Sequence, residues 1–221
     1  MLAIVSPTQA TRFFSRKDSV LRERDHQTRN RRETMTQQGE NTLIVMRGYP
    51  GTGKSTIARA LAQTLQAPLI DRDIIRQMAV DILGDQPEIG RFAYNLLFAL
   101  SRKQLELNLS VIIDTPLTYR KTYEQAREMA NTFHIPMLVV HCWCLPELQK
   151  CRIEGRKGTV SQFQITSWEE WERWKPRFEV YEDHGCIVNT ANPIHDSLSH
   201  ILSCLQQTSQ LTRDAINFSE A

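Results

Sequence analysis

Residues 48–55 are the part of this sequence that most directly predicts chemistry. They read GYPGTGKS and match the pattern G-x-x-x-x-G-K-[ST], with Gly48, Gly53, Lys54 and Ser55 at its fixed positions. Glycines let such a loop wrap backbone N–H groups around phosphate oxygens, while the lysine reaches the β- and γ-phosphates and the serine hydroxyl ligates Mg²⁺. The predicted nucleotide-binding residues are Gly48, Tyr49, Pro50, Gly51, Thr52, Gly53, Lys54, Ser55 and Thr56.

The nucleotide is expected to be ATP. The sequence contains neither an Asn-Lys-x-Asp segment, which would read guanine, nor the signature sequence of ABC-type ATPases. At 221 residues, the chain also leaves too little length for the lid domain of an AAA+ machine. ATP and Mg²⁺ are therefore the predicted cofactors, and a small phosphotransferase is the simplest interpretation.

The segment DRDIIR, residues 71–76, is the second candidate for chemistry. It follows a short apolar run, and the carboxyl ends of parallel strands share one edge of a sheet, so its acids are expected near the γ-phosphate. On a helix, Asp73 and Arg76 would be neighbours, three residues apart. A positioned carboxylate can accept the proton of an attacking hydroxyl, whereas acids in a first helical turn can also serve as a cap. The residues alone leave both interpretations open.

A family resemblance separates these interpretations. GYPGTGKST followed by RDIIRQ resembles the small-kinase group that contains bacteriophage-type polynucleotide 5′-kinase, and zeta-toxin-type sugar-nucleotide kinases are similar there. The resemblance to these AAA-like, ATP-dependent kinases covers roughly residues 42–206. It implies that Asp73, rather than Asp71, is the general base and that Arg76 contacts the acceptor. It also implies a P-loop sheet with strand order 2-3-1-4-5.

Asp114 is the candidate second metal residue beside Ser55. SVIIDTP puts it at the end of a buried strand, where a P-loop kinase often keeps an acid for Mg²⁺-bound water. The resembling family also has an acidic strand end here. The alternative is that Asp114 or Thr115 caps a helix that Pro116 helps to start.

Two arginines are candidates for charge stabilisation in the transition state. In LPELQKCRIEGRKG, Arg152 and Arg156 are four residues apart and fall on one face if the helix continues past Gly155. Arginines at this position in the resembling kinases form a lid, and guanidinium groups stabilise the negative charge on the transferring phosphoryl group. The alternative is a basic last helical turn that matches the helix dipole.

Trp168, Trp171 and Trp174 lie on one face of a predicted helix. Their spacing favours an amphipathic helix packed on the core over a platform for nucleic-acid bases, because interleaved glutamates would repel a polyanion.

Cys142 and Cys144 end a strand-like run and lack a second pair at metal-ligand spacing, so buried cysteines are expected rather than a zinc site.

The elements that must position these residues alternate along the chain. Continuous apolar runs between helical patterns predict an α/β fold, a three-layer P-loop NTPase sandwich with a five-stranded parallel sheet and helices on both faces. The predicted strands are residues 42–47, 67–70, 110–114, 136–143 and 186–190. The predicted helices are residues 54–66, 87–107, 119–133, 145–155, 167–183 and 193–206.

Charge and composition set the predicted domain limits. Residues 1–40 carry a net charge of +3 and show no sustained period, which predicts a disordered basic leader. Acids from Asp18 onward weaken a targeting peptide, and a translation start at Met35 is the favoured interpretation. Residues 41–208 form the predicted kinase domain, and residues 209–221 form a tail. Five cysteines without framework spacing favour a cytoplasmic protein, and no apolar run is long enough to span a membrane.

The predicted function is transfer of the γ-phosphoryl group of Mg·ATP to a hydroxyl of a small molecule or sugar nucleotide. The alternatives are a polynucleotide 5′-hydroxyl kinase, or a nucleotide-binding ATPase module without transfer chemistry. A near-neutral folded part makes a nucleic-acid acceptor the less favoured one. No motif identifies the acceptor, and residues 79–95, with Arg91 and Tyr94, are as consistent with a surface helix as with an acceptor pocket. The sequence does not predict an oligomeric state.

Overall fold

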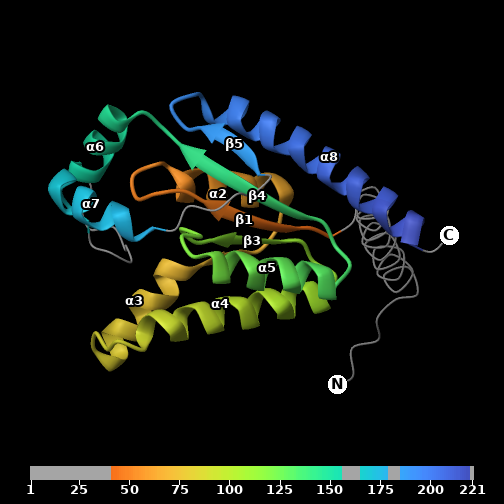
Figure 1. The fold of residues 1–221 in the computed structure, drawn as a ribbon, viewed down its shortest axis with the longest axis horizontal. Helices are drawn as coiled ribbons and strands as arrows, with labels where there is room; N and C mark the ends of the chain where they lie inside the picture. Colours follow the sequence, from red (N-terminus) through yellow and green to blue (C-terminus); the bar gives the residue numbers. More distant parts are fainter. Residues whose placement is uncertain (1–40, 156–164, 179–184, 220–221) are drawn as a thin grey trace, which may run out of the picture. The chain divides into compact units, whose positions relative to one another are not determined.

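The structure, a computed structural model, describes residues 41–155, 165–178 and 185–219, with side chains through Asp214. Five parallel strands form one sheet in the order β2-β3-β1-β4-β5, which confirms the predicted fold class and strand order (Figure 1). The predicted leader, residues 1–40, lies outside the described residues. The strands are β1 (Leu43–Arg47), β2 (Leu69–Asp71), β3 (Val111–Asp114), β4 (Met137–Trp143) and β5 (Cys186–Asn189).

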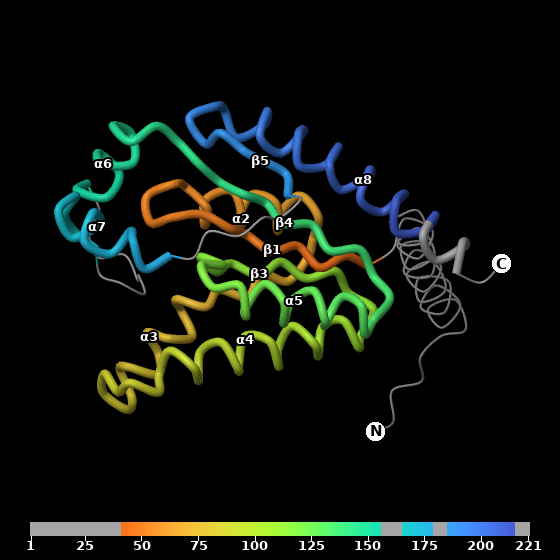
Figure 2. Tube along the Cα trace, viewed as in Figure 1, coloured from red at the N-terminus to blue at the C-terminus, as the bar shows by residue number. Residues whose placement is uncertain are grey.

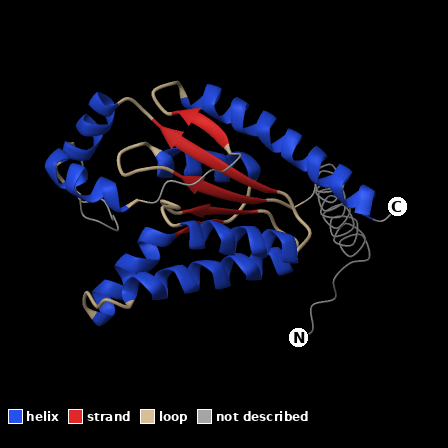
Figure 3. Cartoon of the chain, viewed as in Figure 1, coloured by secondary structure: helices blue, strands red, loops and turns tan. Residues whose placement is uncertain are grey.

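Helices alternate with these strands along the chain (Figure 3). Within the described residues, no helix has the length and apolar character that crossing a membrane requires. The helices are α2 (Lys54–Leu65), α3 (Arg72–Leu83), α4 (Ile89–Glu106), α5 (Arg120–Thr132), α6 (Pro146–Glu154), α7 (Trp168–Trp174), the 3₁₀ turn η1 (Lys175–Arg177) and α8 (Ile194–Ser219).

The sheet is buried on both faces because successive side chains of each strand point to opposite sides. Leu43 and Val45 of β1 face a cluster that α4 and α5 complete, whereas Ile44 and Met46 face a cluster that α2 and α8 complete. Figure 2 shows α4 and α5 running together beside β3 and α8 running along β5. The three layers follow directly from this alternation.

All five strands end at one edge, which is where the chemically interesting residues gather. The phosphate-binding loop follows β1, and Asp71 and Asp114 end the neighbouring strands β2 and β3 in paired register. Asp114 is also in register with Met46, two residues before the loop begins. The parallel register therefore brings the two sequence motifs together.

Helix α3 is absent from the helical segments that the sequence predicted, although a helix start near Asp73 was expected. It begins immediately after β2, because the Asp71 side chain accepts hydrogen bonds from the first free backbone N–H groups, and it ends at Gly84 with a positive φ of 77°. The sequence does contain the signal of an amphipathic helix here, which the prediction overlooked beside the DRDIIR motif. Apolar residues recur at helical spacing at Ile75, Met78, Ala79 and Ile82.

Helix α7 is shorter than the predicted segment 167–183. It ends at Trp174 and passes into the 3₁₀ turn, where Pro176 has no N–H to continue an α-helical ladder. The tryptophan face packs as expected: Trp171 is 1% exposed and contacts Tyr49 and Phe178 with ring centroids 5.0 and 5.5 Å away. The rings therefore serve as core, and they tie α7 to the phosphate-binding loop.

Helix α8 is longer than the predicted segment 193–206. It continues to Ser219 and includes most of the segment 209–221 that the sequence assigned to a tail. Gln210 Nε2 donates to Asp214 Oδ1 at 3.0 Å, and side-chain pairs four residues apart stabilise exposed helix. The predicted buried cysteines, Cys142 and Cys144, are 1% and 8% exposed.

The core placement of α4 can be tested with two leucines of the same helix. Leu97 is 0% exposed and Leu100 is 41% exposed. We expect Leu97→Ala to lower the free energy of unfolding by about 2–5 kcal/mol because it leaves a cavity, and Leu100→Ala by about 1 kcal/mol or less. Urea unfolding followed by tryptophan fluorescence measures both, and equal losses would contradict this packing.

Candidate active site

At Gly48 and Gly53, two fixed positions of the motif, the backbone of the phosphate-binding loop has a positive φ that only glycine adopts without strain. Gly48 has φ +148°, and a Cβ there would lie 2.5 Å from the carbonyl oxygen of Cys142. Gly53 has φ +79°, and a Cβ there would lie 3.1 Å from Thr190 Oγ1. The two glycines of the motif therefore allow β1, β4 and the end of β5 to approach the loop closely.

Carbonyl groups of the loop are bound from its outer side. Gln149 Nε2 of α6 donates to Pro50 O at 2.7 Å, and Thr190 Oγ1 donates to Thr52 O at 2.7 Å. In a trans peptide the N–H points opposite to the C=O, so the N–H groups that follow Pro50 and Thr52 are directed into the loop. Inward N–H groups at the start of a helix form a concave site for anions.

Lys54 and Asp114 form a buried ion pair beside this loop. Lys54 Nζ donates to Asp114 Oδ1 at 2.8 Å, and the two side chains are 11% and 2% exposed. Burial by itself lowers the pKa of Lys54, but the Asp114 carboxylate outweighs it, with Asp73 and Asp71 adding to the effect, so the pKa is raised. Lys54 is therefore a stable cation at the edge where all three acids meet.

Asp114 has the unsatisfied oxygen that a Mg²⁺ site would use. Its Oδ2 is buried and has no hydrogen-bond partner among the described residues. A buried polar atom without a partner is costly, and a hydrated divalent cation held by carboxylate and hydroxyl oxygens would satisfy it. Ser55, the second residue of α2, carries the hydroxyl that the motif assigns to the metal. The donor set thus fits Mg²⁺.

The two aspartates of DRDIIR have different surroundings. Asp71 is the cap of α3, and its Oδ1 accepts from the backbone N–H groups of Asp73 at 2.8 Å and Ile74 at 3.3 Å. Burial raises the pKa of Asp71, and the neighbouring Asp114 and Asp73 charges raise it further. The structure therefore assigns the cap to Asp71, which leaves the side chain of Asp73 available for other contacts.

Asp73 pairs with a different arginine from the one expected. Its Oδ1 accepts from Arg72 Nη1 at 3.3 Å, and its side chain is 23% exposed. Arg76, the expected neighbour, instead donates from Nη2 to Asp85 Oδ1 at 2.8 Å. Asp85 lies in the turn after α3 and had no predicted role, so local helical spacing alone could not reveal this competition.

Arg72 is the residue of this site that sequence reasoning missed. It is 1% exposed, its guanidinium carbon lies 4.5 Å from the centroid of the Tyr94 ring, and its Nε has no hydrogen-bond partner among the described residues. Tyr94 in turn accepts from Thr115 Oγ1 at 3.3 Å. Tyr94 was named with the expected acceptor segment, and it does face the site, whereas Arg91 is exposed.

The arginine predicted for the lid is held beside the loop. Arg152 of α6 donates from Nη1 to Thr190 Oγ1 and from Nη2 to Thr190 O, both at 2.8 Å. The same threonine donates to the loop at Thr52 O, so Arg152, the end of β5 and the loop form one network. Arg156, its predicted partner, lies outside the described residues.

A cavity of about 350 Å³ opens on the outer side of the loop, between α2, α6 and the segment from β5 to α8. This volume falls in the range of small-ligand sites, and the apolar Ile57 and Ile194 offer surface for a flat ring. The cavity is lined by Gly51, Gly53, Thr56, Ile57, Arg152, Thr190, Asn192 and Ile194.

Comparison with known proteins identifies the class. Residues 43–181 match the family model of an AAA domain, and the chain belongs to this family. No curated protein shows a significant match to the sequence. The fold, the family and the phosphate-binding loop together define a nucleotide-binding, kinase-like P-loop protein, as the resemblance to small P-loop kinases predicted.

Solved structures share the fold. A candidate kinase from Chloroflexus aurantiacus j-10-fl is 21% identical with a TM-score of 0.63, covering 76% of this chain and 98% of that one. A sugar kinase from Janibacter sp. HTCC2649 is 18% identical with a TM-score of 0.58, covering 76% and 95%. The Mycobacterium tuberculosis APS kinase CysC, in complex with AMPPNP and APS, is 14% identical with a TM-score of 0.56, covering 76% and 99%. At these identities the likeness concerns the fold.

The raised pKa of Asp71 predicts a pH-dependent stability. A carboxyl whose pKa is raised by folding favours the folded state when protonated, and this contribution is lost as pH rises through the folded pKa. Asn caps helices as well as Asp does but does not titrate. We therefore expect Asp71→Asn to be more stable than the wild type, by a margin that grows from about pH 4 towards pH 7.

Urea unfolding across this pH range, in chelator and without nucleotide, measures the margin. Asp81→Asn, on an exposed position of the same helix, controls for general charge effects. A wild type that gains stability over Asp71→Asn as pH rises would contradict the assigned sign.

Proposed function

We propose that this protein transfers the γ-phosphoryl group of Mg·ATP to a hydroxyl group of a small molecule or sugar nucleotide. The observation that carries the proposal is the division of roles between two neighbouring aspartates. Asp71 is occupied as a helix cap, whereas Asp73 keeps a partly exposed carboxylate that Arg72 orients, close enough to Lys54 to raise its pKa. A carboxylate in this position is suited to take the proton of an attacking hydroxyl.

In this proposal the phosphate chain lies in the concave face of the loop. Inward N–H groups and the start of α2 bind the β- and γ-phosphates, and Lys54 exchanges part of its contact with Asp114 for the phosphate oxygens. Ser55 and the free oxygen of Asp114 would hold Mg²⁺, which would supply positive charge to offset the charge of the phosphates. The adenosine part would occupy the cavity lined by Thr190 and Ile194.

The transfer step needs one base and several positive charges. The acceptor oxygen attacks the γ-phosphorus, its proton passes to Asp73, and the bond from the γ-phosphorus to the bridging oxygen breaks to release ADP. Arg152 is tied to the loop through Thr190 and could stabilise the charge that develops on the transferring group. Arg156 and Arg76 are proposed to contribute from the lid and the acceptor side, as in the resembling kinases.

Arg72 extends the proposal towards the acceptor. It is buried against Tyr94 and contacts the Asp73 carboxylate, so its fixed guanidinium group holds the proposed base in position. Tyr94 and Thr115 are hydrogen-bonded to each other beside Arg72 and carry hydroxyl groups. We therefore propose this group as the wall of the acceptor pocket.

A polynucleotide 5′-hydroxyl kinase is the alternative, favoured by the Arg-Asp-x-x-Arg pattern of residues 72–76. The acids of α7, Glu169, Glu170 and Glu172, lie among the tryptophans and weigh against a long nucleic-acid track. Radiolabel transfer from γ-labelled ATP to a panel of metabolites, sugar nucleotides and 5′-hydroxyl oligonucleotides separates the two. Label appearing only in oligonucleotides supports the alternative, whereas ATP hydrolysis that no acceptor accelerates supports an ATPase module.

The assignment of the base can be tested with the two aspartates as matched variants. We expect Asp73→Asn to lower the rate of transfer by about 10²–10⁴-fold, because the proton loses its acceptor, while the Kd for ATP changes little. Asp71→Asn should keep most of the activity, since asparagine preserves the cap. Single-turnover transfer and fluorescent-nucleotide binding measure the two quantities. Loss of activity in Asp71→Asn with full activity in Asp73→Asn would show that the base was wrongly chosen.

A further inference from the structure

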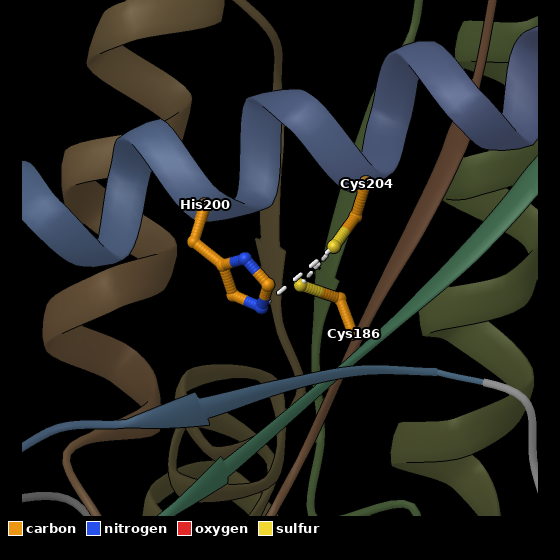
Figure 4. A group of neighbouring side chains, drawn as sticks. All are labelled: Cys186, His200 and Cys204. Atoms are coloured by element: carbon orange, nitrogen blue, oxygen red, sulfur yellow. Dashed lines mark hydrogen bonds between the residues drawn. The ribbon is translucent and has the colours of Figure 1, made fainter.

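Three side chains that can ligate a soft metal ion meet between β5 and α8, away from the loop. Cys186 is the first residue of β5, and His200 and Cys204 are four residues apart on α8, so both point to one face of the helix. Figure 4 shows His200 and Cys204 reaching from the helix towards Cys186 on the strand. We call these three residues the Cys₂His cluster.

The ligating atoms of the Cys₂His cluster are close together. The two sulfur atoms lie 2.7 Å apart, Cys204 Sγ lies 3.9 Å from His200 Nε2, and the three ligating atoms are all within 4.8 Å of one another. Among the described residues, this is the group of at least three cysteine, histidine or acidic side chains whose ligating atoms lie this close together. Two thiols and an imidazole converging from two separate elements are the ligand types that zinc sites use.

We propose that the Cys₂His cluster binds one Zn²⁺ ion. Zn–S bonds of about 2.3 Å and Zn–N bonds of about 2.0–2.1 Å in a tetrahedron place the ligating atoms roughly 3.5–3.8 Å apart. The distance from His200 Nε2 to Cys204 Sγ is already near this value. The two sulfur atoms must move apart by about 1 Å, and a χ1 rotation of the partly buried Cys204 can supply this movement.

The chemistry of the ligands selects the ion. Thiolates and imidazole bind Zn²⁺ well, whereas Mg²⁺ and Ca²⁺ require oxygen ligands. Cys186 is buried, Cys204 is partly buried and His200 is exposed, so the ion can enter from solvent on the histidine side. Water would take the fourth position of the tetrahedron.

A disulfide between the two cysteines is the competing use of the same atoms. It would consume both sulfur atoms and give no role to His200, although the i, i+4 spacing places this histidine directly beside Cys204. A metal ion uses all three side chains. The inclusion of the histidine therefore favours the metal, and the test below distinguishes the two.

A bound ion would join α8 to β5 at the end of the strand opposite the phosphate-binding loop. The helix otherwise holds the strand through apolar contacts such as those of Ile201 and Val188. Metal binding to the folded protein alone adds stability in proportion to RT ln(1 + [L]/Kd). Since neither Lys54 nor Asp73 belongs to these elements, the Zn²⁺ proposal stands or fails independently of the proposed function.

The first measurement is metal binding by the full chain after anaerobic reduction. With Co²⁺ as a probe, we expect one equivalent to produce thiolate-to-metal absorption and the visible bands of tetrahedral coordination. Zn²⁺ should displace Co²⁺ and quench these bands, and a chromophoric chelator in competition gives the Kd for Zn²⁺. Zn²⁺ should also raise the Tm, and a stronger chelator should reverse the shift.

Matched variants assign the ligands. His200→Gln and Cys204→Ser should each weaken Zn²⁺ binding by at least about ten-fold. The controls use residues of the same type outside the cluster: His195→Gln on α8 and Cys151→Ser, both exposed. These should bind Zn²⁺ as the wild type does. His200 is exposed, so its variant also tests the site without disturbing the core.

Three results would overturn the proposal. Co²⁺ spectra without thiolate bands, or equal weakening in the control and cluster variants, would show that the ion binds elsewhere. Alkylation of the unreduced protein, mapped by mass spectrometry, identifies the third result. Protection of Cys186 and Cys204 that a chelator removes supports the metal, whereas protection that only a reductant removes shows a disulfide instead.

Discussion

The orientation of the peptide groups in the phosphate-binding loop is the constraint on which the rest of this structure depends. N–H groups can face a phosphate only if the carbonyl groups of the same loop face outward, and outward carbonyls close to other elements need donors. Gln149 of α6 and Thr190 after β5 supply two of these donors. These contacts fix where α6 and the end of β5 lie beside the loop, and Thr190 in turn holds Arg152 there. Close approach of these elements explains why Gly48 and Gly53 cannot carry a side chain.

A second constraint is charge. Three carboxylates, those of Asp71, Asp73 and Asp114, meet at the ends of β2 and β3, and two cations, Lys54 and Arg72, are placed against them. The imbalance is visible in Asp71, whose pKa burial raises and the other two acids raise further. It is also visible in the unpartnered Oδ2 of Asp114. An excess of carboxylate at such an edge is what a divalent cation would neutralise, so the same imbalance that costs stability prepares a site for Mg²⁺.

The sequence predicted what depends on local pattern. Glycine spacing revealed the loop, apolar runs revealed the sheet, and resemblance supplied the strand order, all before any long-range contact was known. What it could not predict depends on choices between competing partners. Helical spacing offered Asp73 as the partner of Arg76, but the structure pairs Arg76 with Asp85, nine residues away. An arginine at position 72 would be expected on the surface, but the fold buries it against Tyr94, which is twenty-two residues further along the chain. Helix α8 continues beyond the predicted segment through exposed residues, where Gln210 Nε2 donates to Asp214 Oδ1.

The order of the strands divides the proposed activities across the sheet. β2 and β3 carry the acids and the acceptor wall, β1 carries the loop, and β5 with α8 carries one side of the cavity proposed for adenosine. The Cys₂His cluster lies on those last two elements, so an ion there would restrain the wall formed by Thr190, Asn192 and Ile194 without touching Asp73. Any effect of the ion on nucleotide affinity must be matched by an equal effect of nucleotide on ion affinity, because the coupling between two binding sites is reciprocal.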